Sequence, residues 1–320
     1  MITITTIITI NQLVKINFEA IKNINMKRLL LILSIVLIFQ INVFSQDQSA
    51  YFQIGTTSES IDDAVNTVKT ALQNSGFNTI GEYQPGNFKN LTVVCYTRPD
   101  LEKIALSFAD RGSLASALKV GFKKEGNSVK ISMNNPMYLF YAYFIDGVEK
   151  HEKELIKISE DAKNSMKNVG SEFSPFGGTL DKEKLQKYHY KVMMPYFKDA
   201  EELNEFSSFE EGLQVIRNNL ANKKGNTVKV YELVYPDKKV AVFGVGLFST
   251  EDGEPKFLPI IGDENIAAMP YEIILQGNTA SILPGKYRFA LSWPELTMGT
   301  FMKIMSTPGD IKNTMEGLTE

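Results

Sequence analysis

The fold is decided by two segments with the same pattern, SIDDAVNTVKTALQNSG at residues 60–76 and SFEEGLQVIRNNL at residues 208–220. Each begins with a serine that is followed three residues later by an acid, which is typical of a helix N-terminus. Apolar residues then recur at the spacing of an amphipathic helix. Aligned without a gap, the second segment lies 148 residues after the first. We therefore predict two equivalent helices, one in each half of the chain.

The segments after these helices also correspond, and in the same order. Two β-rich runs follow each helix: 77–82 and 91–96, then 228–234 and 240–247. A hairpin with a Gly-Asn turn comes next, at residues 126–127 and 277–278, and such a turn between alternating runs is a hairpin signal. Each hairpin ends at a proline, Pro136 or Pro294, which is predicted to start a helix.

This ordered recurrence predicts an α+β fold made of two similar α/β sandwich-like domains that arose by internal duplication. The predicted domains are residues 46–148 and 206–320, joined by a helical and strand connector at residues 149–205. Residues 51–144 and 206–306 are expected to superpose with the same strand order.

Several features of residues 55–136 occur together in one known family. They are the small-residue start Gly55-Thr56-Thr57, the helix from Ser60 to Gly76-Phe77, the strand Val93-Val94-Cys95-Tyr96, and the strand 118–122 that closes through Gly126 to Pro136. On these features the segment resembles the bacterial and archaeal domain-of-unknown-function 302 family. Residues 206–294 resemble a more divergent copy, with residues 269–274 at the equivalent strand. The resemblance implies an α+β fold and paired domains. The family has no established reaction, so the resemblance supplies no catalytic residues.

Residues 26–45 have the pattern of a secretory signal peptide. Met26-Lys27-Arg28 is a positively charged start, and residues 29–39 are apolar apart from Ser34. That run is too short to cross a bilayer core of about 30 Å as a helix. Val43-Phe44-Ser45 supplies a cleavage site, so the mature chain is predicted to begin at Gln46 and to be periplasmic or secreted.

An uncleaved N-terminal anchor is the alternative to this signal peptide. Residues 1–25 match neither a signal nor a core, and we interpret Met26 as the true start.

The composition restricts the class of function. The 320 residues carry a formal net charge of −3, and removal of the basic residues 1–45 leaves about −6. A mildly acidic chain without a basic block is not expected to bind nucleic acid. The single cysteine, Cys95, excludes an internal disulfide and is interpreted as buried packing. Two histidines, His151 and His189, exclude histidine-rich metal sites, and neither a metal nor a cofactor is predicted.

Common catalytic signatures are missing from the chain. It contains no Gly-x-Ser-x-Gly elbow, no His-Glu-x-x-His and no phosphate-binding loop. The acidic pairs Asp62-Asp63 and Glu210-Glu211 lie in first helical turns, where they favour the helix dipole. An enzyme is therefore not the preferred class.

The connector has three predicted parts. Residues 149–168 carry a narrow apolar stripe and are predicted to form a surface helix. Residues 173–178 form a turn-rich break, and residues 187–197 alternate like a half-buried strand. His189 and Met193 are soft ligands that suit Cu(I), but positions four apart in a strand are about 13 Å apart. A weak Cu(I) site would therefore need a turn, and the strand is the preferred interpretation.

Methionine and aromatic clusters each have a structural and a functional interpretation. Met298, Met302 and Met305 share one face of a predicted C-terminal helix, and core packing is preferred over a ligand role. The aromatic residues at 138–144 either line an apolar pocket or form the seam between the two copies. The seam is preferred because Trp293 has the matching place in the second copy.

Two functions of different classes remain. The first is a non-enzymatic exported protein that binds an unknown small molecule or protein at the seam, where clefts between domains favour ligands. A homodimer is also compatible with the sequence. The second is a periplasmic enzyme that uses His189 with a neighbouring Tyr or Glu as acid and base.

The predicted ligand site follows from the first hypothesis. His189 can change charge near neutral pH, and Arg288 is a fixed cation for an acidic ligand group. The site comprises Tyr188, His189, Tyr190, Met194, Tyr196, Tyr271, Glu272 and Arg288. The alternative is a closed seam in which these residues satisfy one another and bind nothing.

Overall fold

The computed structural model describes residues 47–320. The predicted signal segment and its cleavage position lie outside the described residues. Over residues 47–320, no helix combines the length and the apolar character needed to span a membrane.

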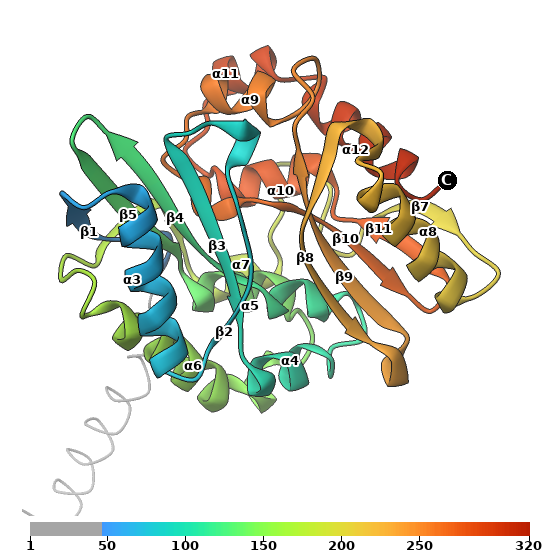
Figure 1. The fold of residues 1–320 in the computed structure, drawn as a ribbon. Coiled ribbons are helices and arrows are strands. Elements are labelled where there is room, and N and C mark those ends of the chain that lie inside the picture. Colours follow the sequence, from blue (N-terminus) through green and yellow to red (C-terminus); the bar gives the residue numbers. More distant parts are fainter. Residues whose placement is uncertain (1–46) are drawn as a thin grey trace, which may run out of the picture. The chain divides into compact units, whose positions relative to one another are not determined.

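The chain has helices and two antiparallel sheets, which confirms the predicted α+β class (Figure 1). The first half contains β1 (Gln48–Thr57), α3 (Ile61–Asn74), β2 (Asn78–Tyr83), β3 (Leu91–Thr97), α4 (Pro99–Ala105), β4 (Leu118–Glu125), β5 (Ser128–Asn134) and α5 (Pro136–Tyr143). The connector contains α6 (Glu152–Met166), β6 (Ser174–Leu180) and α7 (Lys182–Gln186). The second half contains β7 (Glu201–Glu205), α8 (Phe209–Ala221), β8 (Thr227–Tyr235), β9 (Val240–Leu247), α9 (Glu254–Ile261), β10 (Tyr271–Gln276), β11 (Thr279–Ile282), α10 (Gly285–Ser292), α11 (Met298–Lys303) and α12 (Thr307–Gly317).

The two halves have the same strand order. It is β2-β3-β4-β5-β1 in the first sheet and β8-β9-β10-β11-β7 in the second, and β6 extends the first sheet beside β1. A register irregularity also recurs, because β2 bulges before Gly81 and β8 bulges before Tyr231.

Local chemistry explains why the matching elements form. The Ser60 hydroxyl accepts a hydrogen bond from the Asp63 amide at 3.1 Å, and the Ser208 hydroxyl accepts one from the Glu211 amide at 3.1 Å. Each bond satisfies an amide that the first helical turn leaves free. The hairpin glycines, Gly126 and Gly277, have φ angles of 58° and 60°, a conformation that glycine adopts without steric cost.

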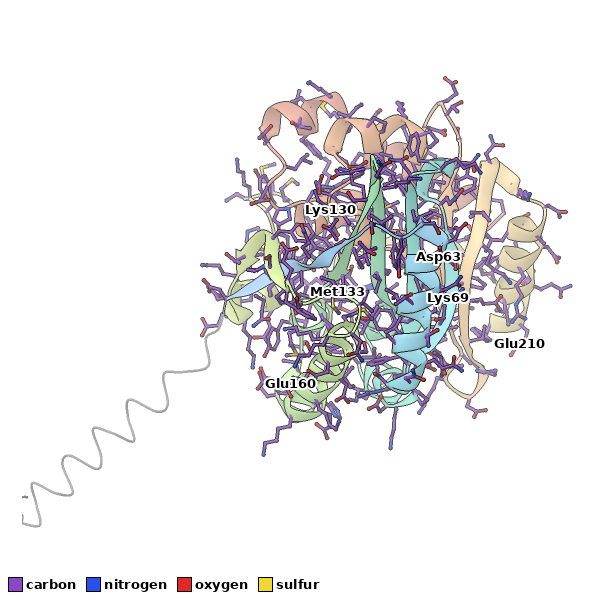
Figure 2. The ribbon with its side chains drawn as sticks, turned by 60° about the vertical axis from the view of Figure 1, so that its left-hand side comes forward. Asp63, Lys69, Lys130, Met133, Glu160 and Glu210 are labelled. Carbon is purple, nitrogen blue, oxygen red and sulfur yellow. The ribbon has the colours of Figure 1, made fainter. Side chains whose placement is uncertain are left out.

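Each sheet has one face toward its own helix and one toward the other half. On β4, Leu118, Val120 and Phe122 are buried on the α3 side, whereas the alternate residues Lys119 and Gly121 contact the second half. This follows from the two-residue period of a strand. In Figure 2, Asp63 and Lys69 mark α3 and Glu210 marks α8. Figure 1 shows these two helices on opposite flanks with the sheets between them.

The predicted start of the last equivalent helix at Pro294 is wrong. Helix α10 begins at Gly285 directly after Pro284, and it ends at Ser292, with Trp293 as its C-cap just before Pro294. Both positions suit proline, because proline is tolerated in a first helical turn and is also common shortly after a helix ends.

The connector differs from its prediction in two of three parts. Helix α6 is observed, and its predicted stripe is buried at Leu155, Ile158, Ala162 and Met166. The predicted break at 173–178 is instead the start of β6, which pairs with β1 through a register irregularity. The predicted strand at 187–197 is a loop. Met193 there has a φ angle of 70°, which an extended strand does not allow.

The predicted core packing of the C-terminal methionines is also wrong. Met298, Met302 and Met305 are 49%, 56% and 59% exposed. Helix α11, which contains Met298 and Met302, has no buried residue, so the predicted methionine stripe lies on the surface. Cys95 is fully buried as predicted, and burial raises the pKa of its thiol to about 12.

Candidate functional site

The eight predicted site residues lie on two sides of helix α10. Tyr271, Glu272 and Arg288 are buried between the two halves. Tyr190 and Met194 lie on the opposite side of α10, in the connector loop, where they line a separate pocket. The predicted site therefore combines residues from two separate regions of the fold.

The buried group is a closed ion cluster at the seam. Arg288 Nη2 lies 3.0 Å from Glu272 Oε2, and the Lys119 ammonium of β4 donates to Glu272 Oε1. Arg288 also donates to the carbonyl of Ala268 at 2.9 Å, and its guanidinium lies 4.1 Å from the centre of the Tyr271 ring. Burial lowers the pKa of Arg288, but the nearby Glu272 charge and the tyrosines more than offset this, so the net shift is upward. Arg288 remains a cation fixed within the fold.

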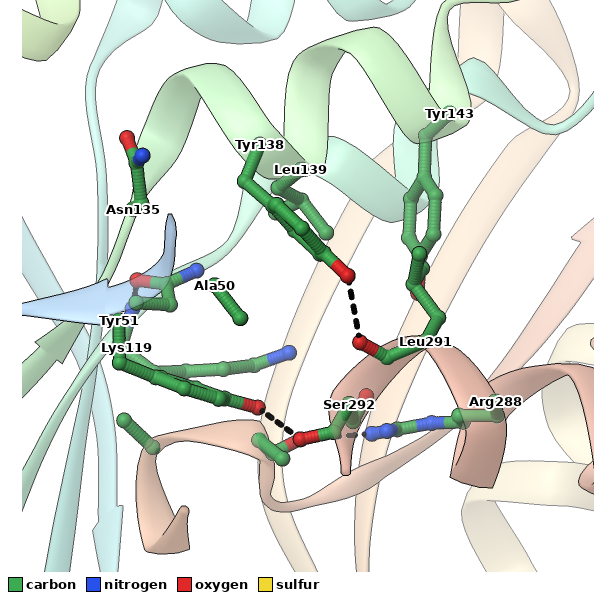
Figure 3. Close-up of a pocket in the computed structure, with 13 residues that line it drawn as sticks. Ala50, Tyr51, Lys119, Asn135, Tyr138, Leu139, Tyr143, Arg288, Leu291 and Ser292 are labelled. Atoms are coloured by element: carbon green, nitrogen blue, oxygen red, sulfur yellow. Dashed lines mark hydrogen bonds between the residues drawn. The ribbon is translucent and has the colours of Figure 1, made fainter. Parts of the chain in front are cut away.

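A small cavity lies beside this cluster, and we call it the seam cavity (Figure 3). Its volume is about 30 Å³, which holds one or two water-sized groups. The Tyr51 hydroxyl donates to the Ser292 carbonyl at 2.8 Å, and the Tyr138 hydroxyl donates to the Leu291 carbonyl at 2.9 Å. Both bonds join the two halves, and a cavity of this volume has no space for an organic ligand.

A larger pocket, which we call the connector pocket, lies between the loop after α7 and helices α10 and α11. Its volume is about 210 Å³. Most of its walls are apolar, and none of its lining residues is acidic: Tyr190, Lys191, Val192, Met194, Lys286, Ala290, Trp293, Leu296, Met298 and Phe301. Its two charged groups are Lys191 and Lys286. Across residues 47–320, neither ammonium forms an ion pair.

Helix α10 supplies a wall of this pocket that the predicted site did not include. Lys286, Ala290 and Trp293 are spaced by four and three residues, which places them on one face of a helix. That spacing is present in the sequence, but a helix predicted to start at Pro294 does not contain these three residues. Arg288, the cation predicted to bind the ligand, lies on the buried face of α10. Lys286 is the cation of α10 that lines the pocket.

The remaining predicted residues, Tyr188, His189 and Tyr196, belong to the connector loop at residues 187–197. The His189 ring packs on Tyr196 with centroids 4.4 Å apart, and its Nδ1 lies 3.4 Å from the Lys187 carbonyl. Tyr188 packs edge-on against Tyr287 of α10. Among the described residues, no hydrogen bond or ion pair joins His189 to a carboxylate, and Glu272 instead pairs with Lys119 and Arg288.

The other histidine lies in a third cavity of about 480 Å³. His151 Nε2 lies 3.5 Å from the Ser107 hydroxyl, which itself lies 2.6 Å from the Ile104 carbonyl and donates to it. In this arrangement the Ser107 hydroxyl donates to the Ile104 carbonyl and not to His151. No group of three His, Cys, Asp or Glu side chains within residues 47–320 could hold a metal.

These features define an α+β protein with two sheets of the same topology and a small apolar pocket beside the connector. No family model matches the chain, and no curated protein matches it. Among solved structures, it is similar to the crystal structure of an uncharacterized conserved protein DUF302 from Bacillus stearothermophilus. The match has 14% identity and a TM-score of 0.28, and it covers 38% of this chain and 97% of that chain.

Proposed function

We propose that the protein is an exported, non-enzymatic binding protein made of two tandem copies of a domain-of-unknown-function-302-like domain. The copies are residues 46–148 and 206–320, and residues 149–205 connect them. The shared strand order and the recurrent bulge of β2 and β8 support the duplication. The signal-peptide pattern at residues 26–45 supports export.

The ligand site is the connector pocket, and its ligand is a small amphiphile with an apolar body and one acidic group. The observation that carries this proposal is the pairing of apolar walls with two lysines that have no acidic partner. Apolar walls with a few polar groups are typical of small-molecule sites. At about 210 Å³ the pocket is smaller than the roughly 300–1,000 Å³ of drug-sized sites, so a medium-chain carboxylic acid is a suitable size.

Binding rather than catalysis follows from the groups that line the pocket. Its polar side chains are two lysines, one tyrosine and Trp293, whose indole N–H donates to the Gly262 carbonyl, and none of them pairs with a carboxylate or a histidine that could act as its base. These groups can hold and orient an anion, but they do not form a nucleophile and base pair.

Trp293 provides a direct test, because it is the single tryptophan of the chain and lines the pocket. We expect 10-bromodecanoate to quench its fluorescence saturably, since bromine quenches on contact, and decanoate to compete. Decanol is the matched neutral control and should bind more weakly.

The variant Ala290→Phe fills the pocket and should abolish the quenching. Quenching that is unsaturable, or that is equal in this variant, would show that the connector pocket is not the site.

A further inference from the structure

The ion cluster at the seam carries an excess of positive charge. Lys119 and Arg288 are both cations, and their side chains are 7% and 3% exposed. Among the described residues, Glu272 is the one carboxylate that pairs with either of them. Burying an unpaired charge is strongly unfavourable, so a further negative charge is expected close by.

We propose that the seam cavity binds a small monovalent anion of about halide size, held by the Lys119 ammonium. Lys119, Arg288 and Glu272 together carry a net charge of +1, and Lys119 and Arg288 line the cavity. A bound monovalent anion brings the group to neutrality. The volume of about 30 Å³ excludes larger anions, because it accommodates little more than one or two waters.

Hydrogen-bond donors are available for this anion. An ammonium group has three N–H donors, and Lys119 uses one on Glu272. The Tyr143 hydroxyl and the Asn134 side-chain amide also line the cavity, and Asn134 Oδ1 accepts from the Lys119 backbone amide at 2.9 Å, which leaves the Asn134 NH2 group as a donor. Figure 3 shows the Lys119 side chain entering the space between Tyr51 and Tyr138.

Other buried acids do not supply the missing charge. Glu254 accepts hydrogen bonds from the Gly86 amide at 2.6 Å, the Leu247 amide at 3.2 Å and the Tyr83 hydroxyl at 3.2 Å, and it touches neither cation. Burial raises the pKa of Glu254 to about 8, so it is mostly neutral at pH 7. Two acids of the second half lie near β4, but both form ion pairs with Lys123, Asp263 at 2.7 Å and Glu264 at 2.6 Å.

The test compares anions at constant ionic strength. Because a ligand that binds only the folded state raises stability by mass action, the melting temperature of the purified chain should rise as chloride or bromide replaces gluconate. Crystals grown in bromide should show an anomalous peak within hydrogen-bond distance of Lys119 Nζ.

Two variants that change the net charge of the ion cluster in opposite directions distinguish anion binding at this site from a general effect of salt. Lys119→Met removes the excess cation and should abolish the chloride response, whereas Glu272→Gln increases the excess and should strengthen it. Lys123→Met is the matched control on the same strand face and should respond as the parent does. An equal response in the parent and in every variant that folds, or a bromide-grown crystal of the parent without that peak, overturns the proposal.

Discussion

Tyr138 and Tyr287 are each the third residue of their helix, and each donates its hydroxyl proton to the seventh residue of the other's helix. Tyr138 of α5 bonds the Leu291 carbonyl at 2.9 Å, and Tyr287 of α10 bonds the Ala142 carbonyl at 3.3 Å. This reciprocal arrangement is what a two-fold axis between two identical domains produces. This arrangement supports the proposed duplication.

The first prediction concerns this tyrosine pair. Tyr138→Phe and Tyr287→Phe should each lower the free energy of unfolding by about 1 kcal/mol, because each leaves a buried carbonyl without its partner. The effect at Tyr138 should be larger, since its bond is shorter. Urea unfolding measures both. Tyr190→Phe is the control, because the Tyr190 hydroxyl has no partner in the described chain; if all three variants behave alike, the reciprocal bonds contribute nothing.

Much of each half could be predicted from sequence because its signals are local. A serine cap with an acid three residues later, or a Gly-Asn turn, depends on atoms a few residues apart, and the structure contains both in each half. Because the same pattern occurs in both halves, even weaker signals, such as the β-rich runs, indicate strands.

The site could not be predicted from sequence because it depends on which face of each helix or strand packs against another element. Alternation at residues 187–197 predicts a strand, but this segment pairs with no strand of either sheet and contains Met193 at a φ angle of 70°. Gly177 and Gly178 suggested a turn, yet they fit within β6 with φ angles of 75° and 78°. Arg288 and Lys286 are two residues apart on α10, and tertiary packing decides which of them is buried.

The second prediction separates the cation of the connector pocket from general surface charge. Lys286→Glu should weaken decanoate binding about tenfold, which corresponds to about 1.4 kcal/mol, and should leave decanol binding unchanged. Titration of Trp293 fluorescence measures both ligands. Lys103→Glu, which changes an exposed lysine of the first half, is the matched control. Equal weakening in the two variants would mean that Lys286 does not contact the ligand.

The third prediction is a pH dependence of stability from Glu254. Burial is the largest cause that raises the pKa of this carboxyl, from 4.5 to about 8 in the folded chain. The folded state therefore holds a proton that the unfolded state releases, so this contribution to stability is complete below about pH 4.5 and is lost as pH rises toward 8. Urea unfolding between pH 5 and 9 should show this decline.

The variant Glu254→Gln tests the assignment of that decline. Glutamine cannot ionise, so the variant should lose the downward slope between pH 5 and 8. Glu232→Gln serves as the comparison, since Lys229 and Arg217 hold the pKa of Glu232 below its ordinary value despite partial burial. A slope that persists in Glu254→Gln must come from another group.

The fourth prediction concerns export. When the chain is expressed from Met26 in a bacterium with a periplasm, the protein recovered from the periplasm should begin at Gln46, because cleavage is expected after Ser45. N-terminal sequencing gives the answer directly. Recovery of a soluble cytoplasmic protein that retains residues 26–45 would contradict both the signal peptide and the proposed location.

The fifth prediction tests how closely the two sheets must approach. A Cβ atom added at Gly81 of β2 would lie 2.2 Å from the Val230 carbonyl oxygen of β8. Backbone atoms cannot move aside as a flexible side chain can, so Gly81→Ala must separate the two bulged strands. We expect a loss of about 3 kcal/mol or more, in the range of severe core strain, measured by urea unfolding.

Gly309 is the matched control, because it lies in helix α12 and a Cβ added there meets nothing within 4 Å. Gly309→Ala should stabilise the protein by up to about 1 kcal/mol, since alanine loses less backbone entropy in a helix. Opposite signs for the same substitution would show that the cost at Gly81 comes from the contact between the halves and not from alanine itself. A Gly81→Ala variant as stable as the parent would mean that β2 and β8 need no such approach.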